Sequence, residues 1–185
     1  MQGAAIEGYA VVSANGMIAD GNGHMPDELK HEPDAHFFRE GLDSAALVVH
    51  GRHSHEQQGP ASDRRRRMIV SHRSAGFFVH PTIANAWVWN PASMAFEEAC
   101  RRMGVTEGKI AVSGGTGVFG LFLRIGFDAF HLSRAGKLML SGGRPVFPQV
   151  PGKTPEQVLS EHGLGPGPVQ VLDREADVTL VSWRR

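Results

Sequence analysis

A single cysteine stands in the 185-residue chain, and this scarcity excludes several kinds of protein. Cys100 alone can build neither an internal disulfide framework nor a multi-cysteine zinc site. No uncharged apolar run approaches the roughly 18 residues of a membrane span, and the first residues, MQGAAIEGYAVV, lack the basic leader of a secretory signal. Neither charge dominates, because 19 Lys and Arg balance 19 Asp and Glu. These absences predict a cytoplasmic protein that binds a small molecule, with neither nucleic acid nor membrane as a partner.

What is present is an alternation of strand-like and helix-like segments over residues 1–185, a length that suits one domain. We expect strands at 5–13, 46–51, 67–71, 86–90, 109–115, 127–134, 168–174 and 178–185. We expect helices at 34–42, 54–58, 91–104, 116–126 and 154–163. Thr154 caps the last of these helices, and the final two strands can pair as a hairpin. This order predicts an α/β fold with a mostly parallel central sheet and an antiparallel C-terminal edge.

Two glycine-containing turns follow predicted strands and lead into predicted helices: residues 51–54 (GRHS) and 113–119 (SGGTGVF). Unpaired N–H groups at the start of a helix favour an anion, and adjacent glycines let a ligand approach the backbone. A third segment, 71–73 (SHR), places a cation after another strand. Ligands bind at the carboxyl ends of the strands in an open α/β sheet, so the three segments suit a dinucleotide with an extra phosphate. The alternative is an ordinary strand-to-helix turn with Ser54 as its N-cap.

The stretch 14–33 is longer than the roughly 12–15 residues of an ordinary loop, which indicates a function or disorder. Carboxylates run through its end and into the next helix: Asp27, Glu28, Glu32 and Asp34. If the loop covers a pocket, burial would raise the pKa of one carboxylate and let it orient or donate a proton. The alternative is that Asp34 is an ordinary helix-start acid and that the others are solvated.

Two patterns of basic residues are weaker indications of a binding site. The run 64–67 (RRRR) is typical of a solvated face, since nucleic-acid binding would require more such patches and aromatic partners. His53 and His55 could form half of a metal site, but no acid or cysteine cluster completes it at ligand spacing. We therefore predict no metal. Cys100, within the helix expected at 91–104, is predicted to be a small packed or half-exposed thiol and not a nucleophile.

Five stretches, taken in order, carry a resemblance to a known family. They are YAVVSANGMIAD (9–20), VVHGRHSHEQQG (48–59), RRRRMIVSHR (64–73), AWVWNPASMAFEEAC (86–100) and IAVSGGTGVFGLFL (110–123). Their order and spacing resemble the dihydrofolate reductase superfamily, in particular the reductase domain of riboflavin biosynthesis, over nearly the full length. The second is similar to the family's M-G-R-(H/K)-T-(W/Y)-E-S-I-G and the fifth to V-I-G-G-(G/A)-x-(V/I)-Y-x-x-F-L. The resemblance implies a three-layer fold with helices on both faces of the sheet.

The resemblance also implies that NADPH is the cofactor. Residues 51–54 would hold its phosphates, 71–73 its adenine and 2′-phosphate, 114–118 its nicotinamide half and the phosphates, and 14 with 18–20 the nicotinamide ring. By name, the cofactor-binding residues that it implies are Ala14, Ile18, Ala19, Asp20, Gly51, Arg52, His53, Ser54, Ser71, His72, Arg73, Gly114, Gly115, Thr116, Gly117 and Val118.

In the same family a catalytic carboxylate precedes an aromatic pair by a few residues. Counting back from Phe37 and Phe38 gives Asp34, with Glu32 as the alternative, and Ser133 falls where a hydroxyl adjoins the carboxylate. Arg65 falls where dihydrofolate reductases hold an arginine for the glutamate tail of the substrate. The substrate-binding residues implied in this way are Glu32, Phe37, Phe38, Arg65, Ser113 and Phe119.

The C-terminal segment KLMLSGGRPVFP (137–148) resembles the riboflavin-pathway domain more than dihydrofolate reductase. The H-x-E and P-C-x-x-C motifs of the zinc deaminase that often accompanies that domain have no counterpart in the chain. The resemblance therefore implies an NADPH-dependent reductase of a pyrimidine- or pterin-type substrate, first a phosphoribosylaminouracil and alternatively dihydrofolate. It also implies a homodimer through the C-terminal strands. Because His55 and Phe119 replace aromatic residues usual in the family, a nucleotide-binding or sensing protein without turnover is an alternative of another class.

Overall fold

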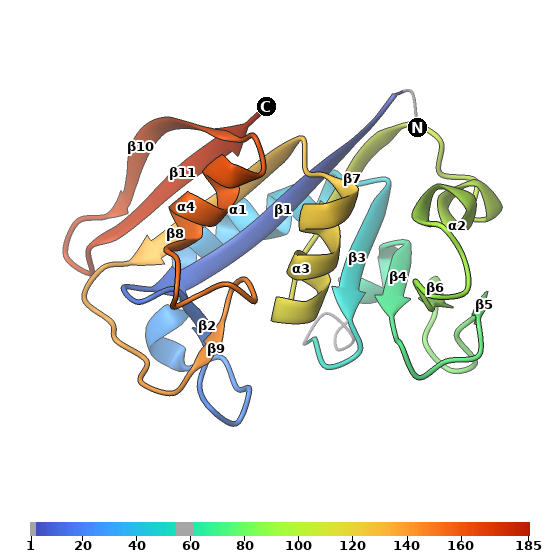
Figure 1. Cartoon of the computed structure of the whole chain (residues 1–185), viewed down its shortest axis with the longest axis horizontal. Helices are drawn as coiled ribbons and strands as arrows, with labels where there is room; N and C mark the ends of the chain where they lie inside the picture. The colour runs from blue at the N-terminus through green and yellow to red at the C-terminus, as the bar shows by residue number, and fades with distance from the viewer. Residues whose placement is uncertain (1–2, 55–60) are drawn as a thin grey trace.

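A central β-sheet organises the protein, which the computed structural model describes over residues 3–54 and 61–185 (Figure 1). Its strands are β1 (Ala4–Ser13), β3 (Leu47–Gly51), β4 (Arg67–Val70), β5 (Phe77–Val79), β6 (Ala86–Trp89), β7 (Gly108–Val112), β8 (Ala129–Ala135), β10 (Gly165–Asp173) and β11 (Val178–Arg184). Across the sheet their order is β10-β11-β8-β1-β7-β3-β4-β6-β5. The strands from β8 to β6 in that order run parallel, whereas β10 and β11 form an antiparallel edge. The predicted sheet is therefore confirmed.

Strand β5, at the opposite edge, is not indicated by the sequence pattern. It pairs antiparallel with β6, so that Phe77 lies opposite Trp89. The strand has only three residues, and two of them, Phe78 and Val79, are exposed. A strand this short has no alternation of buried and exposed residues long enough to be recognised.

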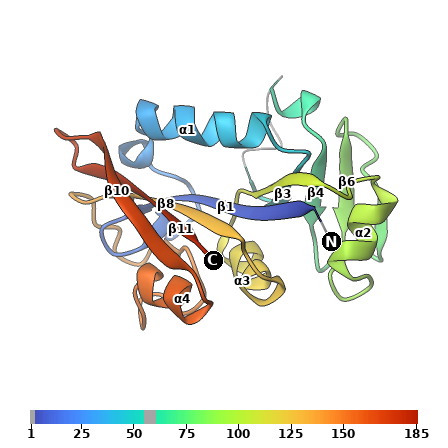
Figure 2. The same cartoon turned by 90° about the horizontal axis from the view of Figure 1, so that it is seen from above.

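Helices cover both faces of the sheet, as expected (Figure 2). Helix α1 (Glu32–Asp43) lies on one face, and α3 (Thr116–Ile125) and α4 (Pro155–Glu161) lie on the other. Helix α2 (Phe96–Arg102) packs beside α3, because the rings of Phe96 and Phe122 meet edge to face with centroids 4.9 Å apart. Two single turns, η1 (Asp27–Leu29) and η3 (Ser62–Arg64), and a small sheet of β2 (Met17–Ala19) with β9 (Arg144–Pro145) complete the described elements.

The two sides of the sheet differ in chemistry. The α3 side holds an aromatic core of Phe119, Phe122, Phe127, Phe130 and Phe147. Gly8 on β1 makes room for that core, because an added Cβ would lie 2.3 Å from Cδ2 of Phe130. The apolar cluster under α1 is smaller and consists of Tyr9, Leu42, Val48 and Ala111. Polar side chains therefore occupy part of the layer between α1 and the sheet.

Most helix boundaries follow the predicted capping signals. Helix α3 begins at Thr116, as predicted, and the capping box between Thr154 and Gln157 begins α4. Helix α1 begins at Glu32, two residues before the predicted start, with Pro33 in its first turn. The expected C-terminal hairpin is present as β10 and β11.

The helix predicted over 91–104 is wrong in its first part, because α2 begins only at Phe96. The side chain of Asn90 accepts a hydrogen bond from the N–H of Ala92 at 3.0 Å, and Trp89 Nε1 donates to the carbonyl of Met94 at 3.0 Å. These bonds hold the segment before Phe96 in turns, as Asn side chains commonly do. The helix predicted at 54–58 lies outside the described residues, apart from Ser54.

The run 64–67 is not the uniformly solvated face that its composition indicates. Arg67 is fully buried in β4, where Nη2 donates to the carbonyl of Ala84 at 2.9 Å and to Asp63 at 3.2 Å. A buried cation requires such partners, so this arginine belongs to the core. Over the part of the chain that the structure describes, no helix has both the length and the apolar character to cross a membrane.

Candidate functional site

The three segments expected to bind a dinucleotide lie where the parallel strands of the sheet end, which we call the carboxyl edge. Strands β7, β3 and β4 are neighbours and run in the same direction, so their carboxyl ends meet at that edge (Figure 1). Residues 113–118 follow β7, residues 51–54 follow β3, and residues 71–73 follow β4. The N–H of Gly51 donates to the carbonyl of Gly114 at 2.9 Å, which joins the first two segments directly. The fold therefore brings together residues up to 67 positions apart (51 to 118) in sequence.

The glycines of this edge leave the backbone open. Gly114 has φ +106°, and an added Cβ would lie 2.8 Å from Cε2 of Phe119, so the turn requires glycine there. A Cβ added at Gly115 or Gly117 would meet no atom within 4 Å. Helix α3 begins between them at Thr116, without a side-chain cap. The start of a helix has unpaired N–H groups, and the open space beside these two glycines fits the phosphates of a dinucleotide.

The segment expected at the nicotinamide ring reaches the same edge. Ala14 follows β1, and its backbone N–H donates to Leu138 while its carbonyl accepts from Arg134, both at 2.7 Å. Ile18 and Ala19 lie in β2, which pairs with β9. The hydroxyl of Thr116 donates to the carbonyl of Pro145 in β9, which links this segment to the start of α3.

The stretch after β2 is folded back on itself. The carboxylate of Asp20 accepts a hydrogen bond from the N–H of His24 at 2.8 Å. This is the largest of the contributions that lower the pKa of Asp20. Leu29, in η1, is fully buried against Val11 and Val178 in a small cluster. The acidic loop of the sequence is therefore anchored beside the start of α1.

Of the acidic candidates, Asp34 is the one that is buried. It lies in the first turn of α1 and is 9% exposed, and burial raises its pKa above the ordinary aspartate range. A hydrogen bond with the hydroxyl of Ser133 on β8 partly offsets that shift. Glu32, the alternative, has a side chain 80% exposed and pairs with Arg39 at 2.5 Å. The fold thus brings Asp34 and Ser133 together, as the sequence comparison implies, and leaves Glu32 at the surface.

The remaining substrate candidates are spread over the fold. Phe37 and Phe38 are half-buried residues of α1, with ring centroids 6.0 Å and 6.4 Å from that of Tyr9 on β1. Arg65 lies at the other end of α1 from Asp34, where it pairs with Asp43 at 2.8 Å. Phe119 is buried in the aromatic core on the α3 side, so the structure does not bring it together with Asp34.

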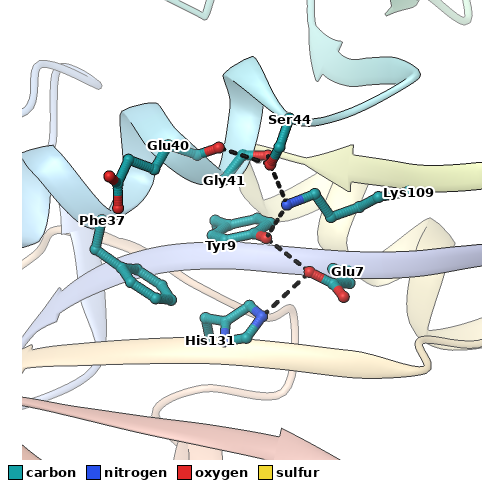
Figure 3. A pocket seen from close by; sticks show the side chains of 8 residues that line it. All are labelled: Glu7, Tyr9, Phe37, Glu40, Gly41, Ser44, Lys109 and His131. Carbon is teal, nitrogen blue, oxygen red and sulfur yellow. Dashed lines mark hydrogen bonds and ion pairs between the residues drawn. The ribbon is translucent and has the colours of Figure 1, made fainter.

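A polar cluster that sequence reasoning missed lies under the C-terminal half of α1 (Figure 3). Lys109 donates to Ser44 at 2.6 Å and to the hydroxyl of Tyr9 at 3.4 Å. Tyr9 donates to Glu7 at 2.7 Å, and Glu7 lies 3.3 Å from Nε2 of His131. A cavity of about 260 Å³ adjoins these side chains. The hydrogen bond from His131 lowers the pKa of Glu7 to about 2, whereas burial and the nearby Glu7 carboxylate raise the pKa of Tyr9.

His50 is the second residue that the sequence interpretation overlooked. It is fully buried on β3, directly before the Gly51 turn, and burial lowers its pKa to about 4. Its Nδ1 lies 2.9 Å from the carbonyl of Gly51. The only signal in the sequence is a histidine within the otherwise apolar run ALVVHG. Among the described residues, no three His, Cys, Asp or Glu side chains are grouped so that they could hold a metal ion.

The architecture defines a class: the chain has a dihydrofolate reductase-like fold. A protein from Shewanella sp. PV-4, provisionally assigned to riboflavin biosynthesis, is similar to it with a TM-score of 0.69 and 17% sequence identity, over 98% of each chain. A diaminohydroxyphosphoribosylaminopyrimidine deaminase/5-amino-6-(5-phosphoribosylamino)uracil reductase from Thermotoga maritima is similar with a TM-score of 0.66 and 17% identity. That match covers 99% of this chain but 57% of the Thermotoga chain.

Dihydrofolate reductase from Enterococcus faecalis, complexed with NADP(H), is similar with a TM-score of 0.63 and 16% identity, over 98% of this chain and 96% of that one. No protein-family model matches the sequence, and no curated protein matches it at a significant level. The resemblance inferred from the sequence motifs is therefore confirmed at the level of the fold.

Proposed function

We propose that the protein is an NADPH-dependent reductase that transfers a hydride to a C=N or comparable group of a pyrimidine- or pterin-type substrate. One observation carries the proposal. A buried carboxylate on α1, Asp34, is hydrogen-bonded to Ser133 on β8, a strand of the same sheet whose carboxyl edge holds the open glycine turns. A proton-handling group and a phosphate-binding edge in one fold are what a nucleotide-dependent reductase needs.

In this proposal the chain binds NADPH along the carboxyl edge of the sheet. The backbone of residues 51–54 and 114–118 binds the pyrophosphate, and residues 71–73 bind the adenine and 2′-phosphate. Ala14 and residues 18–20 contact the nicotinamide end. The open space beside Gly115 and Gly117 supports this assignment, because a phosphate must approach the backbone closely there. When bound, NADPH supplies the hydride.

Asp34 orients the substrate ring and assists its protonation. A carboxyl group whose pKa is raised by burial keeps a proton closer to neutral pH than an exposed aspartate does. Ser133 fixes the orientation of that carboxyl group through its hydroxyl. Phe37 and Phe38 provide an apolar wall that helps to exclude water.

The substrate class is a ribosylated aminopyrimidine of the riboflavin-pathway type, with dihydrofolate as the alternative. The C-terminal segment 137–148 and the similarity to the Shewanella and Thermotoga proteins support the first assignment. We also propose that the protein is cytoplasmic and forms a homodimer through its C-terminal strands, β10 and β11. The exposure of Val169 and Val171 on the edge strand β10, 65% and 55%, supports such a contact.

A thermal melt with NADPH, with NADH and without nucleotide tests the proposal first. At about a hundred times Kd, a ligand stabilises the native state by roughly 2.7 kcal/mol, which is a shift of several degrees. We expect a larger shift with NADPH than with NADH at equal concentration. No shift with either nucleotide at millimolar concentration would remove the cofactor and the reductase assignment together.

The Asp34→Asn variant then separates an enzyme from a sensor that has kept the fold without turnover. An enzyme loses its NADPH oxidation in the presence of substrate and still shows the NADPH shift. Ser93→Ala, a change on an exposed turn before α2, is a matched control that should keep both. Wild-type protein that binds NADPH but oxidises it with no aminopyrimidine or dihydrofolate would favour the sensor.

A further inference from the structure

Two buried polar atoms near the carboxyl edge have no hydrogen-bond partner among the described residues: Nε2 of His50 and Oγ of Ser113. His50 ends the buried part of β3, and Ser113 directly follows β7. Buried polar groups in native proteins are almost always hydrogen-bonded, so each exception calls for an explanation. A ligand that completes both bonds is one such explanation.

The two side chains are cross-strand neighbours on the α1 side of the sheet. Val48 pairs with Ala111, and Val49 pairs with Val112, so the same register sets His50 beside Ser113. Side chains alternate along a strand, and Val48 and Ala111 both pack in the cluster under α1 with Leu42. His50 and Ser113, two residues further along each strand, therefore lie on that same side, where Asp34 and Ser133 also meet.

The spacing of these groups indicates the length of the ligand. Ser133 is on β8, and β8, β1, β7 and β3 are successive strands of the sheet. Neighbouring strands are about 4.8 Å apart, so Ser113 is two strand spacings from Ser133 and His50 is three. The register of β1 also offsets them by two residues along the strands, because Gly8 pairs with Val112 and Val11 with Ser133. Ser113 is therefore roughly 12 Å and His50 roughly 16 Å from Ser133. A single heterocycle on Asp34 does not reach His50, which is the farther of the two groups. The ligand must carry an arm that crosses β1 and β7.

The protonation of His50 indicates the chemistry of the arm. A carbonyl oxygen only accepts, so Nδ1, 2.9 Å from the carbonyl of Gly51, carries the ring proton. Burial holds the pKa of His50 at about 4, and the imidazole is neutral near pH 7. Its Nε2 is therefore an acceptor that needs a donor from the ligand. The hydroxyl of Ser113 can both donate and accept.

We infer that His50 and Ser113 are specificity-determining residues that bind a hydroxylated arm, a sugar or polyol attached to the ring that Asp34 orients. The inference rests on the proposed reductase function and names the substrate within it. A hydroxyl of the arm donates to Nε2 of His50, and a neighbouring hydroxyl exchanges a hydrogen bond with Ser113. An aromatic arm offers His50 no hydroxyl donor. The site thus selects ribosyl- or ribityl-substituted aminopyrimidines over dihydrofolate. Because both atoms are covered in this structure, the layer under α1 must open to admit the arm.

Calorimetric titration with a matched pair of probes tests this inference in the presence of NADP⁺, which allows binding without turnover. The probes are ribityl-lumazine and the corresponding methyl-lumazine, which lacks only the polyol. Wild-type protein should bind the ribityl probe about tenfold more tightly, because each of the two hydrogen bonds typically contributes a few-fold in affinity. His50→Leu and Ser113→Ala should each bring that ratio towards one. His50→Gln, whose amide oxygen can accept, should restore part of it.

The outcomes separate this inference from the function on which it rests. If NADPH raises the melting temperature but the two probes bind with equal affinity, the binding site for the arm is overturned and the reductase assignment stands. A wild-type preference that survives both His50→Leu and Ser113→Ala also overturns it, because the arm then binds elsewhere. If NADPH gives no shift, the reductase assignment fails and the inference falls with it. Ser113→Ala removes a single unpartnered hydroxyl, so it keeps the test valid even if His50→Leu does not fold. His36→Leu, on the exposed face of α1, is the control and should keep the preference.

Discussion

The backbone N–H of Gly51 donates to the carbonyl of Gly114 at 2.9 Å, and this single bond joins two turns that lie far apart in the sequence. The bond forms because β3 and β7 are adjacent and parallel, so that both strands end at the same level of the sheet. The second turn then leaves its backbone open at Gly115, and Gly117 is open at the start of α3, because an added Cβ at either residue would meet no atom within 4 Å. The proposed phosphate site is thus a property of strand order, with the glycines keeping it free of side chains.

Neighbouring glycines in the second turn should respond differently to the same substitution. Gly114→Ala should lower the free energy of unfolding by roughly 1–3 kcal/mol, because the residue has positive φ and its Cβ would overlap Phe119. Gly115→Ala meets no atom, so it should keep the wild-type stability and weaken NADPH binding by filling the approach to the backbone. Urea unfolding and NADPH titration of the two variants measure both effects. Unchanged NADPH affinity in Gly115→Ala would place the phosphates elsewhere.

The buried carboxyl group of Asp34 should make stability depend on pH. Because burial raises its pKa, the folded state holds the proton to a higher pH than the unfolded chain does. The stability from this group is therefore complete below the ordinary aspartate range and is lost as the pH rises through the folded pKa. Asp34→Asn removes that loss, so it should melt above the wild type by a few degrees near neutral pH, and the gap should close towards acid pH.

Melting curves at a series of pH values measure that gap. Asp43→Asn, a carboxylate 61% exposed at the other end of the same helix, serves as the control. A gap for Asp34→Asn that is constant across the series would show that the carboxyl group is not buried with a raised pKa, and the acid assigned to the proposed reaction would need to be another residue.

How much of this site the sequence predicts depends on how local each feature is. The turns at 51–54 and 113–118 follow from strand ends that are visible along the chain, whereas the pairing of Asp34 with Ser133 is implied only by the resemblance to the dihydrofolate reductase superfamily. The bond between Glu7 and His131 joins residues 124 positions apart, and no local pattern marks it. The unpartnered Nε2 of His50 is equally invisible, because burial of a side chain depends on what the whole fold lays over it. The burial of Arg67 could not be predicted for the same reason, since it depends on hydrogen bonds with Asp63 and with the carbonyl of Ala84.

The pair of Glu7 and His131 should stabilise the fold above acid pH. Its hydrogen bond lowers the pKa of Glu7 to about 2, so the stabilisation is present above the unfolded pKa of glutamate and is lost as the pH falls towards 2. Glu7→Gln should cost roughly 1–2 kcal/mol near neutral pH, because the carboxylate is partly solvated. The cost should disappear in acid. Glu40→Gln, an exposed carboxylate lining the same cavity, should change little at any pH. If both substitutions changed the free energy of unfolding equally, the effect of Glu7 would be one of general surface charge and not of its pairing with His131.

Arg73 should set the preference for NADPH over NADH. It is exposed just beyond β4, where the proposed adenosine end of the cofactor lies, and a guanidinium is well suited to a 2′-phosphate. Arg73→Gln should raise the Kd for NADPH by about tenfold and leave that for NADH nearly unchanged, because NADH lacks that phosphate. Fluorescence titration with both nucleotides at fixed salt measures the ratio. Arg102→Gln, on α2 and paired with Glu98 at 2.9 Å, is the matched control. If Arg73→Gln weakens both nucleotides equally, the arginine contributes a general positive field, and the 2′-phosphate must be recognised by another residue of the edge.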